Sequence, residues 1–313
     1  YLMKESDGVI CGNKYIEKYA HNSGAKNTLI LPTVIDIDKY TIKPVHTIHR
    51  QSFTIGWIGS PSTTKYLEIV REPLAKLGQL LPVKLYLVGA DNIKKITIDN
   101  VQIISEPWSE DNEQTALEAF DVGIMPLYDR PWDKGKCAFK LIQYMASFLP
   151  VVSSNVGMNA EIIHNRGNGL LASNSDDWFH ALYKIYLDHG IRKVMGNNGR
   201  KLIEKDFTIQ SRLADFEAFI GREIQLVETI DLDQELVTLP SYSLVTIGLN
   251  CASTIARTID SVLRQTILPK QHVFVLGSSE DDSYNLILSY KSYIEEKGIE
   301  FVLLDELFTT VWE

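Results

Sequence analysis

The sequence predicts an α/β protein with two successive parallel sheets: a doubly wound sheet over residues 51–225 and a second, truncated α/β unit over residues 242–313. Short runs with apolar residues on both faces alternate with segments of helical periodicity, which is typical of a parallel sheet covered by helices on both sides. An acidic stretch over residues 226–241 separates the two series of runs and is interpreted as a linker. A chain of 313 residues is long enough for two domains of ordinary size.

Residues 1–50 contain two short apolar runs on either side of a helical segment. We expect strands over residues 8–11 and 29–32 and a helix over residues 13–20. The polar stretch that follows, to about residue 51, is interpreted as a linker.

The elements of the doubly wound unit follow one another as strand, turn and helix. Its first strand ends at Gly59, and apolar side chains then recur at helical spacing from Tyr66 to Leu77, with Pro73 expected to kink or restart that helix. We expect right-handed crossovers, as in nearly all parallel sheets. The expected strands cover residues 53–58, 83–88, 101–104, 122–125 and 151–153, and the expected helices cover residues 115–120, 139–148 and most of 175–225.

The second unit repeats this alternation with a different sequence. The expected strands cover residues 243–248, 272–276 and 301–304, and the expected helices cover residues 254–264 and 284–293. The series stops inside this unit, and both ends of the sequence are interpreted as cuts through a longer polypeptide. We therefore expect a site built from two domains to be only half present.

Composition narrows the classes of protein that fit. Hydrophobic residues make up 45% of the chain and charged residues 23%, which are ordinary values for a globular protein. The formal net charge of -9 argues against a broad nucleic-acid surface, which needs a basic face. Cys11, Cys137 and Cys251 lie far apart without the spacing of a zinc site, which favours a reducing, cytoplasmic setting.

The chemistry is expected where the strands of the parallel sheet end, because ligands bind outside the carboxyl ends of such strands. Gly59 and Ser60 follow the first strand, and Lys65 lies in the helix that comes next. Small residues let backbone amides approach an anion, and a lysine offsets its charge. The alternative is an ordinary strand-to-helix turn capped by a hydroxyl. Neither the dinucleotide-binding glycine fingerprint nor the Walker pattern is present.

A lysine-bearing glycine loop before the predicted helix at residues 139–148 gives a stronger signal. Lys136, Lys140 and Gln143 recur every three to four residues, so that one helical face presents polar groups. The start of the helix adds partial positive charge, and together these features favour phosphate recognition. The alternative is a solvated basic helix start with Leu141 and Met145 in the core.

Several motifs together resemble the donor-binding domain of family 4 (group 1) glycosyltransferases, which have the GT-B fold with a Rossmann-like sheet. The resemblance covers about residues 1–225, of which the first 50 resemble the tail of the acceptor-side domain. The order and spacing of the motifs all agree with the family. They cover residues 58–60, 120–127, 135–152, 156–163 and 167–171.

The resemblance implies transfer of a sugar from a nucleotide-diphosphate sugar to an acceptor hydroxyl, usually with retention of configuration and without a metal or other cofactor. Gly59 and Ser60 would lie by the diphosphate, Lys65 would offset its charge, and Lys140 would lie on the helix that faces the donor. Gln143 stands where many members have the second of two glutamates, the one that usually holds the ribose.

This sequence departs from the family at the first of these two glutamates, because that position is Gly135. Lys136 could take part of the phosphate contact instead. The motif at residues 156–163 adds Gly157 and Asn159 to the donor site. Trp108 and Pro126 are candidate lining for the base, with hydrophobic packing as the alternative.

The second unit resembles the opening of family 2 glycosyltransferases, which have the GT-A fold. The aspartate that usually ends the second strand is Leu276 here, and the metal-binding Asp-x-Asp of that family lies beyond this chain. We therefore expect this unit not to be catalytic as it stands.

These observations favour a fragment of a bifunctional glycosyltransferase that uses a UDP- or GDP-sugar, with a glycan or lipid-linked acceptor and no nucleic acid, in the synthesis of cell-surface polysaccharide. Two alternatives stay open: a nucleotide-sugar-binding module without turnover, and a GT-B-type sugar-nucleotide epimerase. Cytoplasmic placement is expected, and peripheral association with the inner face of a membrane through segments outside this sequence is left open.

Overall fold

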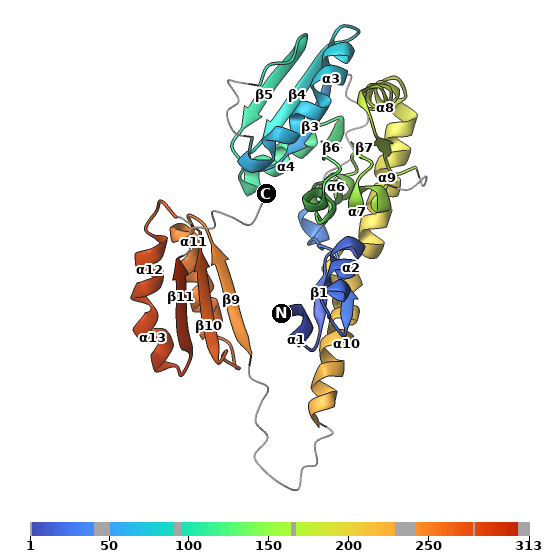
Figure 1. The fold of residues 1–313 in the computed structure, drawn as a ribbon. Helices are drawn as coiled ribbons and strands as arrows, with labels where there is room; N and C mark the ends of the chain where they lie inside the picture. The colour runs from blue at the N-terminus through green and yellow to red at the C-terminus, as the bar shows by residue number, and fades with distance from the viewer. Residues whose placement is uncertain are drawn as a thin grey trace. The chain divides into compact units, whose positions relative to one another are not determined.

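The structure is a computed structural model that describes residues 2–40, 51–90, 96–163, 167–228, 242–277 and 279–305. The chain divides into two compact units, Tyr1–Thr229 and Ile230–Glu313, and each is described by itself (Figure 1). Most of the predicted linker at residues 226–241, and much of the one before residue 51, lie outside the described residues. No helix of the described residues is long and apolar enough to cross a membrane.

The first unit begins with a small two-stranded parallel sheet. Strands β1 (Val9–Cys11) and β2 (Thr28–Ile30) pair, and α2 (Lys14–Asn22) connects them after the short α1 (Leu2–Glu5). Asn13 begins α2, because its side-chain oxygen accepts a hydrogen bond from the backbone N–H of Ile16 at 2.9 Å. The helix and both strands expected in this part of the sequence are confirmed.

The main sheet of this unit has six parallel strands in the order β5-β4-β3-β6-β7-β8. The chain runs outward from β3 to β5, returns to β6 beside β3, and then runs outward on the other side. This reversal makes the carboxyl ends of β3 and β6 the switch point at which ligands bind in such sheets. The strands are β3 (Phe53–Ile58), β4 (Val83–Val88), β5 (Val101–Glu106), β6 (Val122–Met125), β7 (Val151–Ser154) and β8 (Leu170–Ala172).

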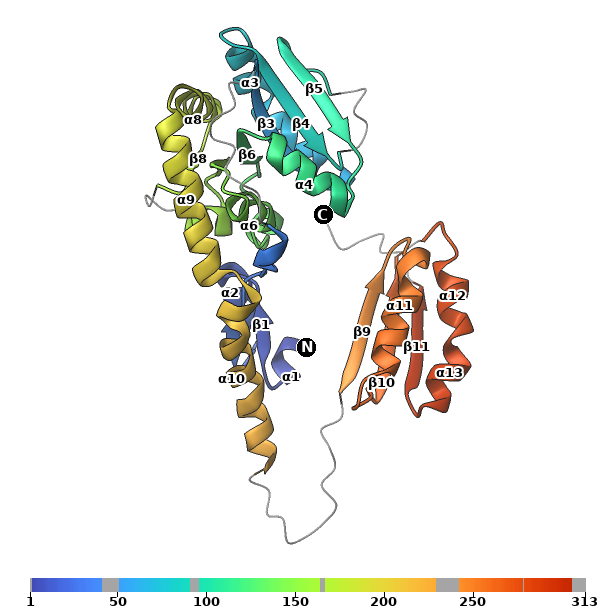
Figure 2. The same cartoon turned by 180° about the vertical axis from the view of Figure 1, so that it is seen from behind.

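Helices cover both faces of this sheet, which confirms the doubly wound prediction (Figures 1 and 2). Alternate residues of β4 point to opposite cores, with Leu85 and Leu87 on one face and Tyr86 and Val88 on the other. The first face is covered by η2 (Pro61–Val70), α3 (Arg71–Gly78) and α8 (Ser175–Leu187), and the second by α4 (Glu110–Ala119), α6 (Phe139–Ala146) and α9 (His189–Asp206). The restart expected near Pro73 is found, since a 3-10 helix gives way to an α-helix at Arg71.

Several short elements of the first unit were not predicted from the sequence, among them three that flank the later strands of the main sheet. Strand β8 has three residues, α5 (Pro131–Lys134) has four, and α7 (Gly157–Ile162) has six. None is long enough to show a hydrophobic period of its own. Strand β8 nevertheless completes the sheet by pairing with β7.

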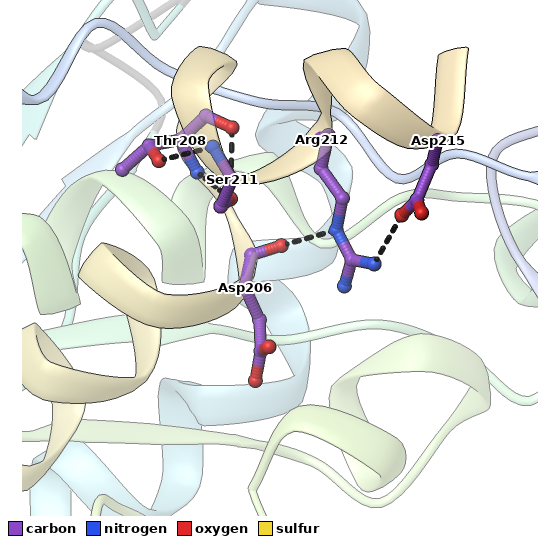
Figure 3. A network of polar contacts seen from close by, with 5 residues as sticks. All are labelled: Asp206, Thr208, Ser211, Arg212 and Asp215. Atoms are coloured by element: carbon purple, nitrogen blue, oxygen red, sulfur yellow. Dashed lines mark hydrogen bonds and ion pairs between the residues drawn. The ribbon is translucent and has the colours of Figure 1, made fainter. Parts of the chain in front are cut away.

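A corner between α9 and α10 (Ile209–Glu228) attaches the N-terminal segment to the main sheet's helices. Ile35 pairs with this corner, donating its N–H to the carbonyl of Phe207 at 3.0 Å. Thr208 and Ser211 cap α10 reciprocally, each side-chain oxygen accepting the other's backbone N–H at 3.1 Å (Figure 3). Arg212 donates to the carbonyl of Asp206 at 2.8 Å and so ties α10 to the last turn of α9.

The second unit is a three-stranded parallel sheet in the order β11-β10-β9. Strands β9 (Ser243–Gly248), β10 (Gln271–Leu276) and β11 (Glu300–Asp305) confirm the three predicted strands. Helix α11 (Ala252–Leu263) confirms the first predicted helix. The helix expected over residues 284–293 is two helices, α12 (Ser283–Ser289) and α13 (Lys291–Glu296), which meet at Tyr290.

Candidate functional site

The carboxyl ends of β3, β4 and β5 are in direct contact. A methyl group added at Gly59 would overlap the ring of Trp57, and one added at Gly89 would overlap the carbonyl oxygen of Gly59 and lie 3.1 Å from Cβ of Trp108. Gly89 also has a φ of +74°, which favours glycine. The two glycines therefore let the ends of β3 and β4 approach closely, with the Trp57 ring packed against Gly59 and Trp108 beside Gly89.

The three predicted lysines gather at the end of β3. The Nζ atoms of Lys65 and Lys136 lie 5.8 and 5.3 Å from the centre of the same ring, that of Tyr66. The Nζ atom of Lys140 lies 5.7 Å from the centre of the Trp57 ring. The charge of Lys136 contributes to lowering the pKa of Lys140. Lys136 therefore lies near Lys140 as well as near Lys65, with which it shares the Tyr66 ring.

Acidic side chains of the described residues do not neutralise this cluster of positive charge. Among the described residues, none of Lys65, Lys136 and Lys140 forms an ion pair. Burial, with a smaller contribution from the charge of Lys136, lowers the pKa of Lys140 to about 8. A half-buried ammonium group beside a second cation is unfavourable by itself, and an anion bound between them would relieve both penalties.

The loop that bears Lys136 is held from two sides. The hydroxyl of Tyr66 donates to the buried carboxylate of Asp133, which joins the loop to η2. The side-chain amide of Asn13 donates to the carbonyls of Lys134 and Lys136 at 3.3 and 3.1 Å. The sequence did not point to Asp133 or Asn13, because each acts on residues that are distant along the chain.

Ser60 is engaged within its own turn. Its backbone N–H donates to Oγ1 of Thr63 at 3.0 Å, and its hydroxyl lies 3.1 Å from that of Ser62. The local bonding therefore matches the alternative of a capped strand-to-helix turn. The roles predicted for Gly59 and Ser60 at a diphosphate stay predictions.

Gln143 and Trp108 meet at a residue that sequence reasoning missed. Gln143 is 4% exposed, and its Nε2 donates to Oε1 of Glu113 at 2.7 Å and to the hydroxyl of Tyr40 at 3.3 Å. Nε1 of Trp108 donates to Oε2 of Glu113 at 2.7 Å. Glu113 lies on α4 in a polar run of sequence that resembles any solvated helix, so no pattern singled it out.

The remaining predicted residues lie at the ends of β6 and β7. Pro126 directly follows β6 and is buried. Gly157 has a φ of +51°, and a methyl group there would lie 3.0 Å from Cα of Lys134, so it brings α7 against the lysine-bearing loop. Asn159 is 1% exposed, and its Nδ2 has no hydrogen-bond partner among the described residues.

Metal ligands were not predicted from the sequence. Within the described ranges there is no group of three or more His, Cys, Asp or Glu side chains arranged to hold a metal ion.

A family model described as "Glycosyl transferases group 1" matches residues 52–188. A sequence comparison with curated proteins gives no significant match.

Several solved structures share the fold. Sucrose-phosphate synthase from Thermosynechococcus elongatus superposes with a TM-score of 0.58 at 17% identity, over 72% of this chain and 60% of that one. Anabaena HepE in complex with UDP-glucose gives 0.58 at 17% identity, over 71% and 65%. A mutant of S. aureus TarM in complex with fondaparinux, alpha-GlcNAc-glycerol and UDP gives 0.55 at 16% identity, over 71% and 46%.

The chain spans less than two thirds of the length of each of these proteins. The predicted parallel, Rossmann-like sheet is confirmed by the strand order and by these likenesses. Residues 52–188 thus match the model of group 1 glycosyltransferases, and the first unit shares the fold of these solved structures. The GT-A assignment of the second unit is not tested by these matches and stays a prediction.

Proposed function

We propose that the first unit binds the nucleoside diphosphate of a sugar donor and acts in transfer of that sugar to an acceptor hydroxyl. The observation behind this proposal is the lysine cluster at the switch point of the sheet, three cations without acidic partners among the described residues. The family match over residues 52–188 supports the same reading. The structure of HepE with UDP-glucose shows that a protein of this fold binds such a donor.

The chemistry suits the charges present. In glycosyl transfer the bond between the anomeric carbon and the diphosphate oxygen breaks, and the acceptor oxygen bonds to that carbon while its proton departs. The leaving diphosphate gains negative charge as its bond breaks. Lys136 and Lys140 lie where they can stabilise this charge, and preorganised cations in a site of low polarity are effective for that purpose.

The finer features of the reaction belong to the same proposal. Retention of configuration, independence of a metal, a glycan or lipid-linked acceptor and a place in cell-surface polysaccharide synthesis all rest on the family resemblance. The same holds for a cytoplasmic location. The chain spans less than two thirds of each matched protein, so the complete activity is itself part of the proposal.

The site assignment is tested by Lys140→Ala. We expect its affinity for the diphosphate that binds the parent chain to fall by about 1–3 kcal/mol, because a charge-assisted contact is lost. Isothermal titration calorimetry with UDP, GDP and ADP measures this. Lys76→Ala is the matched control, since Lys76 lies in the last turn of α3 and pairs with Glu72 and Asp176. If Lys140→Ala bound the nucleoside diphosphate as tightly as the parent, the assignment of the lysine cluster to the diphosphate site would be wrong.

A second candidate is a binding module without turnover. It is favoured by Gly135 and Gln143, which stand where many relatives have glutamates. Release of free nucleotide from UDP- or GDP-sugars separates the two functions. A chain that binds the donor but releases no nucleotide with any acceptor is a binding module.

A further inference from the structure

A single carboxylate connects the polar side chains beside the lysine cluster. Glu113 accepts hydrogen bonds from Gln143 at 2.7 Å, Tyr40 at 3.3 Å and Trp108 at 2.7 Å. These donors come from α6, from the segment before the main sheet and from the loop after β5. Burial, reinforced by the negative charge of Glu113, raises the pKa of Tyr40, so its hydroxyl stays protonated and able to donate.

The charge of Glu113 explains the amide at position 143. A glutamate there would place two carboxylates at the 2.7 Å separation that the amide and Glu113 now have. Like charges at that distance cannot both stay ionised, so one would have to take up a proton. The amide of Gln143 instead donates a hydrogen bond to Glu113. The two residues together therefore still provide one carboxylate, which comes from Glu113 on α4 and not from position 143 on α6.

The carboxylate lies between the lysine cluster and the exposed indole of Trp108. Gln143 is one helical turn beyond Lys140 on α6, and Trp108 is 53% exposed with its Nε1 fixed by Glu113. Strand β5, which leads to Trp108, is two strands from β3, where the lysines gather. That is about 10 Å at the usual strand spacing, and a ribose lies between the phosphates and the base of any nucleotide.

Glu113 can accept a further hydrogen bond. A carboxylate has about four acceptor positions, and contacts with described residues use two on Oε1 and one on Oε2. A hydroxyl is a suitable donor for the position left on Oε2, because hydrogen bonds to an ionised oxygen are short and strong.

We propose that Glu113 is a donor-binding residue, and that its carboxylate accepts a hydrogen bond from a ribose hydroxyl of the nucleoside diphosphate. The inference rests on the proposed function, and it adds a residue and a ligand group to that site. In the same arrangement, Gln143 orients the carboxylate and Trp108 flanks the base. Glu113 thus makes the site selective for ribonucleotides over deoxyribonucleotides.

The test combines a variant with a ligand that lacks one hydroxyl. UDP and GDP are each titrated against their 2′-deoxy and 3′-deoxy forms, with the full chain and with Glu113→Gln. In the parent, we expect loss of one of the two hydroxyls to weaken binding about 10-fold, within the range for a hydrogen bond to a charged group. In Glu113→Gln that penalty shrinks to about 3-fold or less, and Glu118→Gln on the same helix keeps the full penalty.

A merely structural role gives a different pattern. If Glu113→Gln weakened the ribonucleotide and both deoxynucleotides equally, the carboxylate would only be tying helices together and the proposal would be wrong. If the parent bound no nucleoside diphosphate at all, the proposed function itself would fail, and Glu113 would lose its ligand with it.

Two further variants test the proposal even if Glu113→Gln does not fold. Gln143→Glu alone places two carboxylates together, and we expect weakened ribonucleotide binding. Glu113→Gln combined with Gln143→Glu again has one amide and one carboxylate, and we expect recovery of both binding and the penalty for the missing hydroxyl. A double variant that binds but accepts deoxynucleotides as readily as ribonucleotides would contradict the proposal.

Discussion

Lys140 shows how one side chain can be costly for the fold and useful for the site. Its ammonium group lies over the Trp57 ring with Lys136 nearby, and these surroundings favour the neutral form. A bound diphosphate reverses this preference, because it supplies a counter-charge that no acidic side chain in the described part of the chain provides here. Binding and protonation of Lys140 are therefore linked.

This linkage predicts a pH dependence of nucleotide affinity. Since the pKa of Lys140 is about 8 in the free protein, the ammonium form is largely present at pH 7 and is lost above pH 8. We expect the affinity for a nucleoside diphosphate to weaken from pH 7.5 to 9.5, approaching tenfold for each pH unit above the pKa. Calorimetry over that range measures it.

The control for this prediction is Lys140→Arg, because an arginine side chain stays charged over the whole range. Its affinity should vary much less between pH 7.5 and 9.5. An equally steep decline in the parent and in Lys140→Arg would show that another group titrates, and that Lys140 does not cause the pH dependence of nucleotide affinity.

Sequence reasoning found the residues of the site that belong to local motifs and missed those that act from a distance. The three lysines lie in or beside turns that follow recognisable strands and glycines. Glu113 is 30 residues from Gln143, and Tyr40 is 103 residues from it, so the fold alone brings them together. No spacing in the sequence indicates such a pairing when only one chain is considered.

At the scale of elements, the corner between α9 and α10 attaches the first 40 residues to the main sheet's helices. The reciprocal cap of Thr208 and Ser211 fixes where α10 begins (Figure 3). Immediately before that cap, the carbonyl of Phe207 accepts a hydrogen bond from the N–H of Ile35. One short segment therefore ends α9, begins α10 and holds the N-terminal segment.

Removing the cap should weaken this corner. Thr208→Ala leaves the N–H of Ser211 without its side-chain acceptor, and we expect the free energy of unfolding to fall by about 1 kcal/mol, with a range of about 0.5–2. Urea denaturation followed by circular dichroism measures it. Thr208→Ser keeps the hydroxyl and should lose much less. Equal losses in the two variants would point to the methyl group of Thr208, which is 4% exposed, and not to the cap.

Elements with their own hydrophobic period were predicted well, and those defined by neighbours were not. The six-residue strands β3 and β4 are buried along almost their whole length and stand out as apolar runs. Strand β8 has three residues and exists because β7 offers it a pairing edge. The break between α12 and α13 at Tyr290 likewise falls inside a continuous helical pattern.

At the scale of the whole molecule, each unit has a core of its own. The first unit has two large clusters of buried side chains, one on each face of its sheet, and the second has a separate cluster around Ile259 and Phe274. The linker composition and the repeated strand–helix alternation made this division predictable. Because the cores are separate, a change in the stability of one unit can be measured with the stability of the other unit as an internal reference.

His272 provides such a measurement. It is fully buried on β10, stacks on Phe274 with ring centres 3.9 Å apart, and its Nε2 lies 2.8 Å from the hydroxyl of Thr246. Burial lowers its pKa to about 4, so the folded unit holds the neutral ring while the unfolded chain takes up a proton below about pH 6.5. Acidification therefore favours unfolding of the second unit between those two values, and above pH 6.5 this residue contributes no pH dependence.

We expect the opening free energy of the β10 amides, measured by hydrogen exchange with intrinsic rates corrected, to fall from pH 6.5 to 4. The slope contributed by His272 is at most about 1.4 kcal/mol per pH unit. His272→Gln removes the titrating group and should flatten this slope, even if its overall stability is lower. Amides of β3 in the first unit serve as the internal reference. A slope in β10 that survives in His272→Gln would assign the acid sensitivity to carboxylates, and would show that the buried imidazole is not the group whose protonation opens this sheet.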